Sequence, residues 1–285
     1  MSDALLRLAH GGLAPARIDR ILADTAPEDA VARIDRGGLR LPDAVRGAIR
    51  IAGGVRRSEL AGLGVTWAAS GSDAFPIRLV NRAHMPRWLF MRGEIRAMPT
   101  IAIVGTRTCT TYGTELAAAY GAAAAEQGWA VVSGLARGID RAAHVGALGA
   151  RGHAVAVLGS GIDVVYPRSN RDLHDEIVRT GGAVVSEYPP GTRPDGWRFP
   201  TRNRIIVGLS DVVLVVEAGE TGGALITARI ALDAGTPVYA TPADVDRPAS
   251  VGTNQLIRDG AFPVFDADDL RMVLSLVTPL VASAS

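Results

Sequence analysis

The chain has 285 residues, 48% of them hydrophobic, which is enough for one large α/β domain and a smaller companion without disulfides. All thirty basic residues are arginine, so Walker A and Schiff-base chemistry, which need a lysine amine, are excluded. The net charge of +1 divides unevenly, with fifteen arginines against ten acids in residues 1–98 and fifteen against nineteen in the rest, so any nucleic-acid site must be local.

The first part of the chain is predicted to be helical. From Ser2 to about Leu63, apolar residues recur at helical spacing and are interrupted by glycine and proline. This pattern predicts four or five short helices in an N-terminal domain of residues 1–63. Such a bundle is typical of a SAM-like or helix-hairpin-helix module that contacts DNA or a protein, and equally of a simple packing partner.

A second domain, residues 64–285, is predicted to be α/β. Residues 64–98 read as short strands and loops that extend the sheet of the following unit. From Ile101 onward, near-continuous apolar strands alternate with helical stretches, which indicates a doubly wound, mostly parallel sheet. The strands are expected near residues 101–104, 130–132, 153–158, 183–186, 212–216 and 237–240.

The usual signatures of a cofactor or a catalytic site are incomplete. The turn at residues 158–164 has the first two glycines of a dinucleotide fingerprint, but Val164 stands where the third must be. Neither Ser133 nor Ser160 lies in a nucleophile elbow. Asp140 and His144 can share a helix face, yet a third metal ligand is missing. We therefore expect no cofactor, no metal and no catalytic residue.

Glycine- and arginine-rich turns follow several of the predicted strands. Because the carboxyl ends of parallel strands share one edge of a sheet, Arg107, Arg137 and the arginines of residues 193–204 should converge there. Helix N-termini and backbone N–H groups at this edge attract phosphate oxygens. Phe199, with Trp197 before it, offers a base a stacking surface, with burial as the alternative. Ion pairs with nearby acids are the alternative for each arginine.

Long motifs in a fixed order give the chain a family resemblance. They are IAIVGTRTCTTYG, VVSGLARGIDRAAHVGAL, VLGSGIDVVYPRSN, FPTRNRIIVGLSDVVLVVEA, GGALITARIALDAGTPVYA and SVGTNQLIRDGA. Over roughly residues 65–262 the sequence resembles the DNA-processing protein A (DprA/Smf) family. The resemblance implies an extended Rossmann-like domain that binds and protects incoming single-stranded DNA and forms homodimers. It also implies that the protein promotes loading of the recombinase RecA in natural transformation and recombination, without being an enzyme.

The resemblance also implies which residues form the site. The expected DNA-binding residues are Arg107, Ser133, Gly134, Arg137, Gly159, Gly161, Phe199, Arg202, Asn203, Arg204, Gly222 and Gly223. The expected dimer interface includes Asn254, Leu256 and Ile257. Many family members continue into a winged helix, for which the two dozen residues after residue 262 are too few, so none is expected here.

Two other functions stay open at this point. One is a nucleotide-processing enzyme on a phosphate-binding sheet, with Glu217 as its acid. The other is a scaffold whose only task is to recruit a recombinase. The single cysteine, Cys109, and the lack of a long apolar stretch or signal peptide lead us to expect a cytoplasmic protein without a membrane partner.

Overall fold

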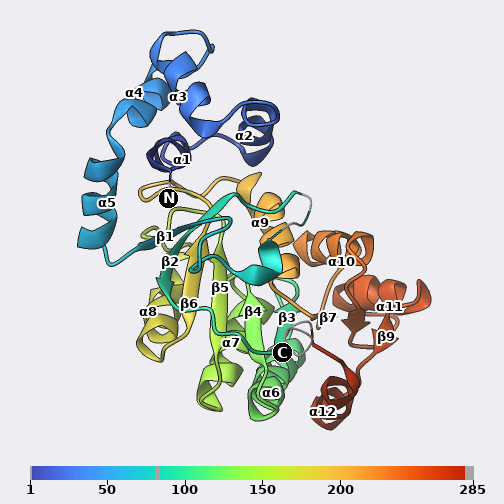
Figure 1. The fold of residues 1–285 in the computed structure, drawn as a ribbon. Helices are drawn as coiled ribbons and strands as arrows, with labels where there is room; N and C mark the ends of the chain where they lie inside the picture. Colours follow the sequence, from blue (N-terminus) through green and yellow to red (C-terminus); the bar gives the residue numbers. More distant parts are fainter. Residues whose placement is uncertain (1, 81, 83, 280–285) are drawn as a thin grey trace.

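The computed structural model describes residues 2–80, 82 and 84–279 (Figure 1). The α-helices are α1 (Asp3–Ala9), α2 (Pro15–Ile21), α3 (Pro27–Asp35), α4 (Asp43–Arg50), α5 (Gly53–Gly62), α6 (Thr111–Glu126), α7 (Ile139–Gly149), α8 (Arg171–Arg179), α9 (Arg198–Gly208), α10 (Gly223–Asp233), α11 (Val251–Arg258) and α12 (Ala267–Leu276). The strands are β1 (Thr66–Ala69), β2 (Trp88–Gly93), β3 (Thr100–Val104), β4 (Ala130–Ser133), β5 (Ala154–Leu158), β6 (Ala183–Ser186), β7 (Val212–Val215), β8 (Val238–Ala240) and β9 (Phe262–Pro263). Short 3-10 turns lie at η1 (Ile77–Leu79), η2 (Arg168–Asn170) and η3 (Pro248–Ser250).

These strands form one mixed sheet in the order β1-β2-β6-β5-β4-β3-β7-β8-β9. In this order, all strands from β6 through β5, β4, β3, β7 and β8 to β9 run parallel to one another. Strand β2 pairs with β6 in the antiparallel direction, and β1 pairs with β2 in the antiparallel direction. Strands β3 and β7 are neighbours, and the chain continues from β3 to β4 on one side of this pair and from β7 to β8 on the other side. The strand order therefore reverses between β3 and β7. This reversal opens a crevice at the carboxyl ends of the strands. The predicted doubly wound, mostly parallel sheet is confirmed.

Helices cover both faces of the sheet. Ile101, Ile103 and Val131 point to the face packed by α6, α7 and α12, whereas Val132 and Val155 point to the face packed by α9 and α10. The central strands β3 to β7 are buried on both faces because they are built from apolar, mostly β-branched residues. In the part of the chain that the structure describes, no helix is both long and apolar enough to span a membrane.

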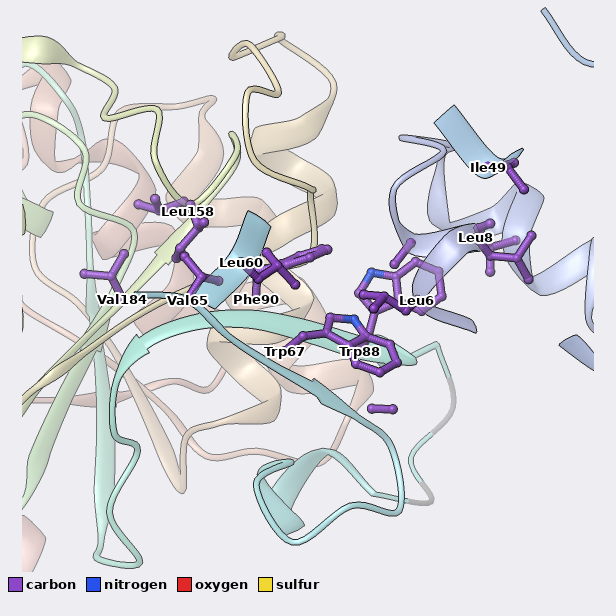
Figure 2. Close-up of a cluster of buried hydrophobic side chains, with 14 of the residues drawn as sticks. Leu6, Leu8, Ile49, Leu60, Val65, Trp67, Trp88, Phe90, Leu158 and Val184 are labelled. Carbon is purple, nitrogen blue, oxygen red and sulfur yellow. The ribbon is translucent and has the colours of Figure 1, made fainter. Parts of the chain in front are cut away.

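The predicted N-terminal helices are present as α1–α5 and pack onto the edge of the sheet. Leu6 and Leu8 of α1 belong to the same buried cluster as Trp88, Phe90 and Val184 of the sheet. Figure 2 shows these side chains running from the helices past the tryptophans to the strands. The predicted boundary at residues 63–64 falls between α5 and β1, and the division into two domains, like the resemblance of α1–α5 to a SAM-like module, stays a prediction.

Candidate functional site

An open cavity of about 990 Å³ lies at the reversal point of the sheet. Its walls come from segments that follow different strands, and both the turn after β3 and the start of α10 line it. The lining includes residues 104–108 at the end of β3 and after it, Ala136 and Asp140 after β4, Tyr166 after β5, residues 194–196 before α9, Phe199, Pro200, Arg202 and Asn203 on α9, and residues 218–227 after β7 and on the start of α10. Sequence reasoning placed ligand-binding turns at this edge, and the structure gathers five of these segments around one space.

Two aromatic rings and a guanidinium form one wall. The Arg107 Cζ atom lies 4.8 Å from the centre of the Phe199 ring, and the Phe199 ring centre lies 5.5 Å from that of Tyr166. Arg107 is exposed, and Tyr166 keeps 45% of its surface open to solvent. This wall therefore presents a cation together with stacking surface, the combination that binds a phosphate and its neighbouring base.

Tyr166 was missed by the sequence reasoning. It lies within a motif that carries the family resemblance, but an aromatic side chain in a loop gives no sign of where it points. Only its contact with Phe199 places it at the cavity.

The floor of the cavity holds a buried arginine. Arg202 is 4% exposed, and its Nη1 donates to the carbonyl oxygen of Val157. Burial lowers the pKa of Arg202 to about 10, although the nearby Asp140 carboxylate raises it. Burial also raises the pKa of Asp140, against the opposing effect of Arg202. Arg202 is thus a fixed charge at the base of the cavity and not a mobile surface side chain.

The loop between β4 and α7 is held by internal hydrogen bonds. Asp140 Oδ2 accepts the backbone N–H groups of Gly134 at 3.1 Å and Ala136 at 3.3 Å. The Ser133 hydroxyl donates to the carbonyl oxygen of Ile103 at 2.7 Å. Contrary to the sequence interpretation, Ser133 and Gly134 are buried, and the Gly134 N–H is directed at Asp140 and not at a ligand.

Several other predicted site residues lie outside the cavity. Arg204 forms a buried ion pair with Glu187, at 2.6 Å between Nη2 and Oε2, which leaves it little freedom to reach a ligand. Burial raises the pKa of Glu187, and Arg204 partly offsets this. Arg137 is exposed and is not among the lining residues, although its neighbour Ala136 is.

The other four predicted glycines divide into two pairs. A side chain at Gly159 would meet the Phe199 ring, and one at Gly161 would meet the backbone of Pro189 and Thr192. Those two glycines make room for the protein itself. Gly222 and Gly223 line the cavity at the start of α10 and have open space beside them, so they keep the backbone accessible.

Asn203 and Glu217 hold neighbouring elements in place. The Asn203 side chain lines the cavity and donates to the carbonyl oxygen of Gly223 at 3.2 Å, which ties α9 to the start of α10. Glu217 is buried, and its Oε2 accepts the Thr110 N–H at 2.9 Å, just before α6. The carboxylate proposed for a nucleotide-processing enzyme is therefore hydrogen-bonded to the backbone of Thr110, the N-cap residue of α6.

The charges along the cavity are nearly balanced. Three arginines line it, and three acids do so as well: Arg107, Arg202 and Arg229 against Asp140, Asp195 and Glu220. Attraction for an anion must therefore come from the placement of donors at particular points and not from a strong overall field. Arg107 and the N-terminus of α10 supply such donors.

Comparison with known proteins shows to which family this chain belongs. The model of the DNA recombination-mediator protein A family matches residues 66–275. The chain belongs to this family. Protein Smf from Escherichia coli is 40% identical over 201 residues, which cover 70% of this chain and 54% of that protein. The chain thus spans about half the length of this curated relative.

Solved structures agree with the family and with the fold. DNA processing protein A (DprA) from Streptococcus pneumoniae superimposes with a TM-score of 0.79 at 32% identity, covering 98% of this chain and 99% of that one. DprA from Helicobacter pylori, whose structure concerns its single-stranded DNA binding mode, has a TM-score of 0.66 at 26% identity and covers 75% of this chain and 98% of that one. The resemblance inferred from the motifs is confirmed.

Proposed function

We propose that this protein binds single-stranded DNA at the carboxyl edge of its sheet. The observation that carries the proposal is the wall of the cavity, where the Arg107 guanidinium and the rings of Phe199 and Tyr166 lie in contact. A cation beside two neighbouring aromatic rings suits a nucleotide phosphate and base without regard to sequence. The cavity is open, which suits a strand passing through it more than an enclosed cofactor. The H. pylori relative, described as binding single-stranded DNA, supports the same conclusion.

The test is a titration with labelled oligonucleotides followed by fluorescence anisotropy. We expect oligo-dT to bind more tightly than a duplex of the same length, and its affinity to fall as salt rises because phosphate contacts release counterions. With three arginines along the cavity, the slope of log affinity against log salt should be about −2, from roughly −0.7 per phosphate. Equal affinity for the duplex, or no dependence on salt, would contradict the proposal.

The competing function is a nucleotide-processing enzyme. Glu217, its candidate carboxylate, is buried and accepts the Thr110 N–H just before α6, and among the described residues lining the cavity there is no histidine or cysteine. We therefore propose that the protein acts by binding alone. Incubation with nucleoside monophosphates, followed by chromatography for released base, checks this. Release of base by the pure protein would favour the enzyme.

We further propose a role in DNA processing during transformation and recombination in the cytoplasm, with RecA loaded onto the bound strand by a homodimer. The expected interface contains Asn254, whose side chain accepts the Ala243 N–H at 3.2 Å and donates to its carbonyl oxygen at 2.8 Å. Leu256 and Ile257 are half-buried beside it. Sedimentation across a range of concentrations tests the dimer, and RecA filament formation on strands covered by single-strand-binding protein tests loading. A monomer at all concentrations, or unchanged filament formation, would contradict these two steps.

A further inference from the structure

Trp197 differs from the other tryptophans of the chain. It is 41% exposed and lies at the N-cap of α9, whereas Trp67, Trp88 and Trp129 are buried. Its indole Nε1 donates to Asp195 Oδ2 at 2.8 Å, which fixes the direction of the ring. A large aromatic side chain at the surface thus has a defined orientation without being part of the core.

The ring is also supported from within the protein. The Arg198 Cζ atom lies 4.8 Å from the Trp197 ring centre and 5.3 Å from that of Tyr188. The rings of Tyr188 and Trp197 meet edge to face at 6.1 Å. Arg198 is held in turn by donating from Nη1 to the carbonyl oxygen of Arg193 at 2.8 Å. A ring held in this way loses little conformational entropy when a flat partner stacks on its open part.

Trp197 lies at the rim of the cavity. Asp195, which accepts its indole N–H, lines the cavity, and so does Phe199, two residues farther along. The Asp195 carboxylate lies 3.8 Å from the Arg198 guanidinium, so its charge is compensated where a phosphate would pass. Trp197 therefore provides a second aromatic surface just outside the cavity, in addition to the one that Phe199 and Tyr166 form beside Arg107.

We propose that Trp197 is a second stacking site, which takes a nucleobase of the strand just outside the cavity. This inference rests on the proposed binding of single-stranded DNA and adds to it a contact made to a base and not to a phosphate. Trp197 then increases the number of nucleotides held by one protomer. It also makes binding depend on the presence of bases and not on charge alone.

The test compares oligo-dT with an abasic oligonucleotide of equal length, which has the same phosphates but lacks bases. Trp197→Ala should lower the affinity for oligo-dT about tenfold, the effect of losing one stacked base. Its affinity for the abasic strand should stay that of the parent, and Trp197→Phe should retain most of the dT affinity because it keeps a ring. Phe262→Ala, which removes an exposed aromatic on β9 at the far edge of the sheet, is the matched control and should change neither affinity.

A second readout comes from the exposure of Trp197 itself. Acrylamide should quench mainly this tryptophan, since the other three are buried, and bound oligo-dT should protect it. If Trp197→Ala lowers the affinity for both strands equally or for neither, or if oligo-dT leaves quenching unchanged, Trp197 is not a base site. If the parent protein binds neither strand, the proposed function itself fails, which is a different result from parental binding by the variant.

Discussion

At the scale of single residues, Arg107 gives the cleanest test of the site. Its side chain is exposed and contacts the Phe199 ring, so removing it takes a charge from the cavity while leaving the core intact. We expect Arg107→Ala to weaken oligo-dT binding by about 1 to 3 kcal/mol, the effect of losing a charge-assisted contact. Fluorescence anisotropy measures the affinity, and circular dichroism should show unchanged folding.

Arg179→Ala is the matched control for this loss of charge. Arg179 is exposed at the C-terminal end of α8, where it forms an ion pair with Glu176 one helical turn before it. A helix that follows a strand in such a sheet runs back toward the opposite edge, so Arg179 lies far from the cavity. Equal losses of affinity in the two variants would mean that overall charge and not the site governs binding.

Arg202 shows what the sequence could not predict about the site. The motif FPTRNR predicts a cluster of basic side chains, but it gives no indication of which arginines face inward. In the structure the phase of α9 buries Arg202 against Val157, whereas Arg204 pairs with Glu187. Loss of the buried Arg202 should therefore lower stability as well as affinity, so Arg202→Ala is a poor test of DNA contact.

The buried His144 predicts how the stability of the protein depends on pH. It is fully buried on α7, neither ring nitrogen has a hydrogen-bond partner among the residues that the structure describes, and burial together with Arg202 lowers its pKa to about 3. The unfolded chain, with a histidine pKa near 6.5, takes up a proton between pH 6.5 and 3 that the folded protein does not. This group therefore makes the free energy of unfolding fall as pH falls, by about 2 kcal/mol between pH 7 and 5.

Replacing His144 by leucine isolates that contribution. No hydrogen bond is lost in His144→Leu, so denaturant unfolding at pH 7 should show similar stability, while the decline toward pH 5 becomes smaller. His10 and His153, whose pKa values burial also lowers, retain their share of the decline, and Asp140, with its raised pKa, acts in the opposite direction in both proteins. An unchanged difference between pH 7 and 5 would show that His144 is not the group responsible.

At the scale of elements, the start of α10 tests whether the backbone itself contacts DNA. Gly223 is the first residue of the helix and lines the cavity, and a methyl group there would meet no protein atom. Gly223→Ala should therefore leave the melting temperature unchanged or slightly raised, since alanine favours a helix. It should weaken oligo-dT binding by about 1 kcal/mol, roughly fivefold, by keeping phosphates from the helix N-terminus.

Gly149→Ala serves as the control for this element. Gly149 ends α7, and a methyl group there also meets open space, but it lies at the other end of a helix that begins near the cavity. Both substitutions reduce the conformational freedom of the backbone in the same way. A difference in oligo-dT affinity between the two variants therefore reports a contact at the cavity. Parental affinity in Gly223→Ala would show that the strand does not approach the start of α10.

The strands and the edge at which the turns lie could largely be predicted from the sequence. Apolar runs such as 101–104 and 212–216 predicted the parallel strands because strands buried on both faces leave a continuous hydrophobic signal. The turns after them were also placed at the correct edge. The hydrogen bonds within each turn could not be predicted from the sequence. Nothing in SGLARGID indicates that Asp140 turns back to accept the Gly134 N–H and so removes that donor from the surface.

At the scale of the whole molecule, the core that joins the N-terminal helices to the sheet implies a single unfolding unit. Leu6 of α1 is fully buried in the cluster that also contains Trp88 and Phe90 of β2 (Figure 2). An ion pair of 3.0 Å between Arg87 and Asp19 adds a polar contact between the same parts. We therefore expect the helices and the sheet to unfold together, although the sequence predicted a domain boundary at residues 63–64.

Leu6→Ala tests this directly in the full chain. Truncating a fully buried leucine costs about 2 to 5 kcal/mol, and because the cluster is shared, the whole transition should move to a lower denaturant concentration when followed by far-UV circular dichroism or by tryptophan fluorescence. Leu276→Ala, which shortens an exposed leucine at the end of α12, should leave both curves unchanged. If Leu6→Ala instead produced an early step in circular dichroism, with the remaining transition in its parental place, the N-terminal helices would be an independent domain. Their packing against β2 would then be a docking contact and would leave the sheet and its proposed DNA-binding edge able to fold without them.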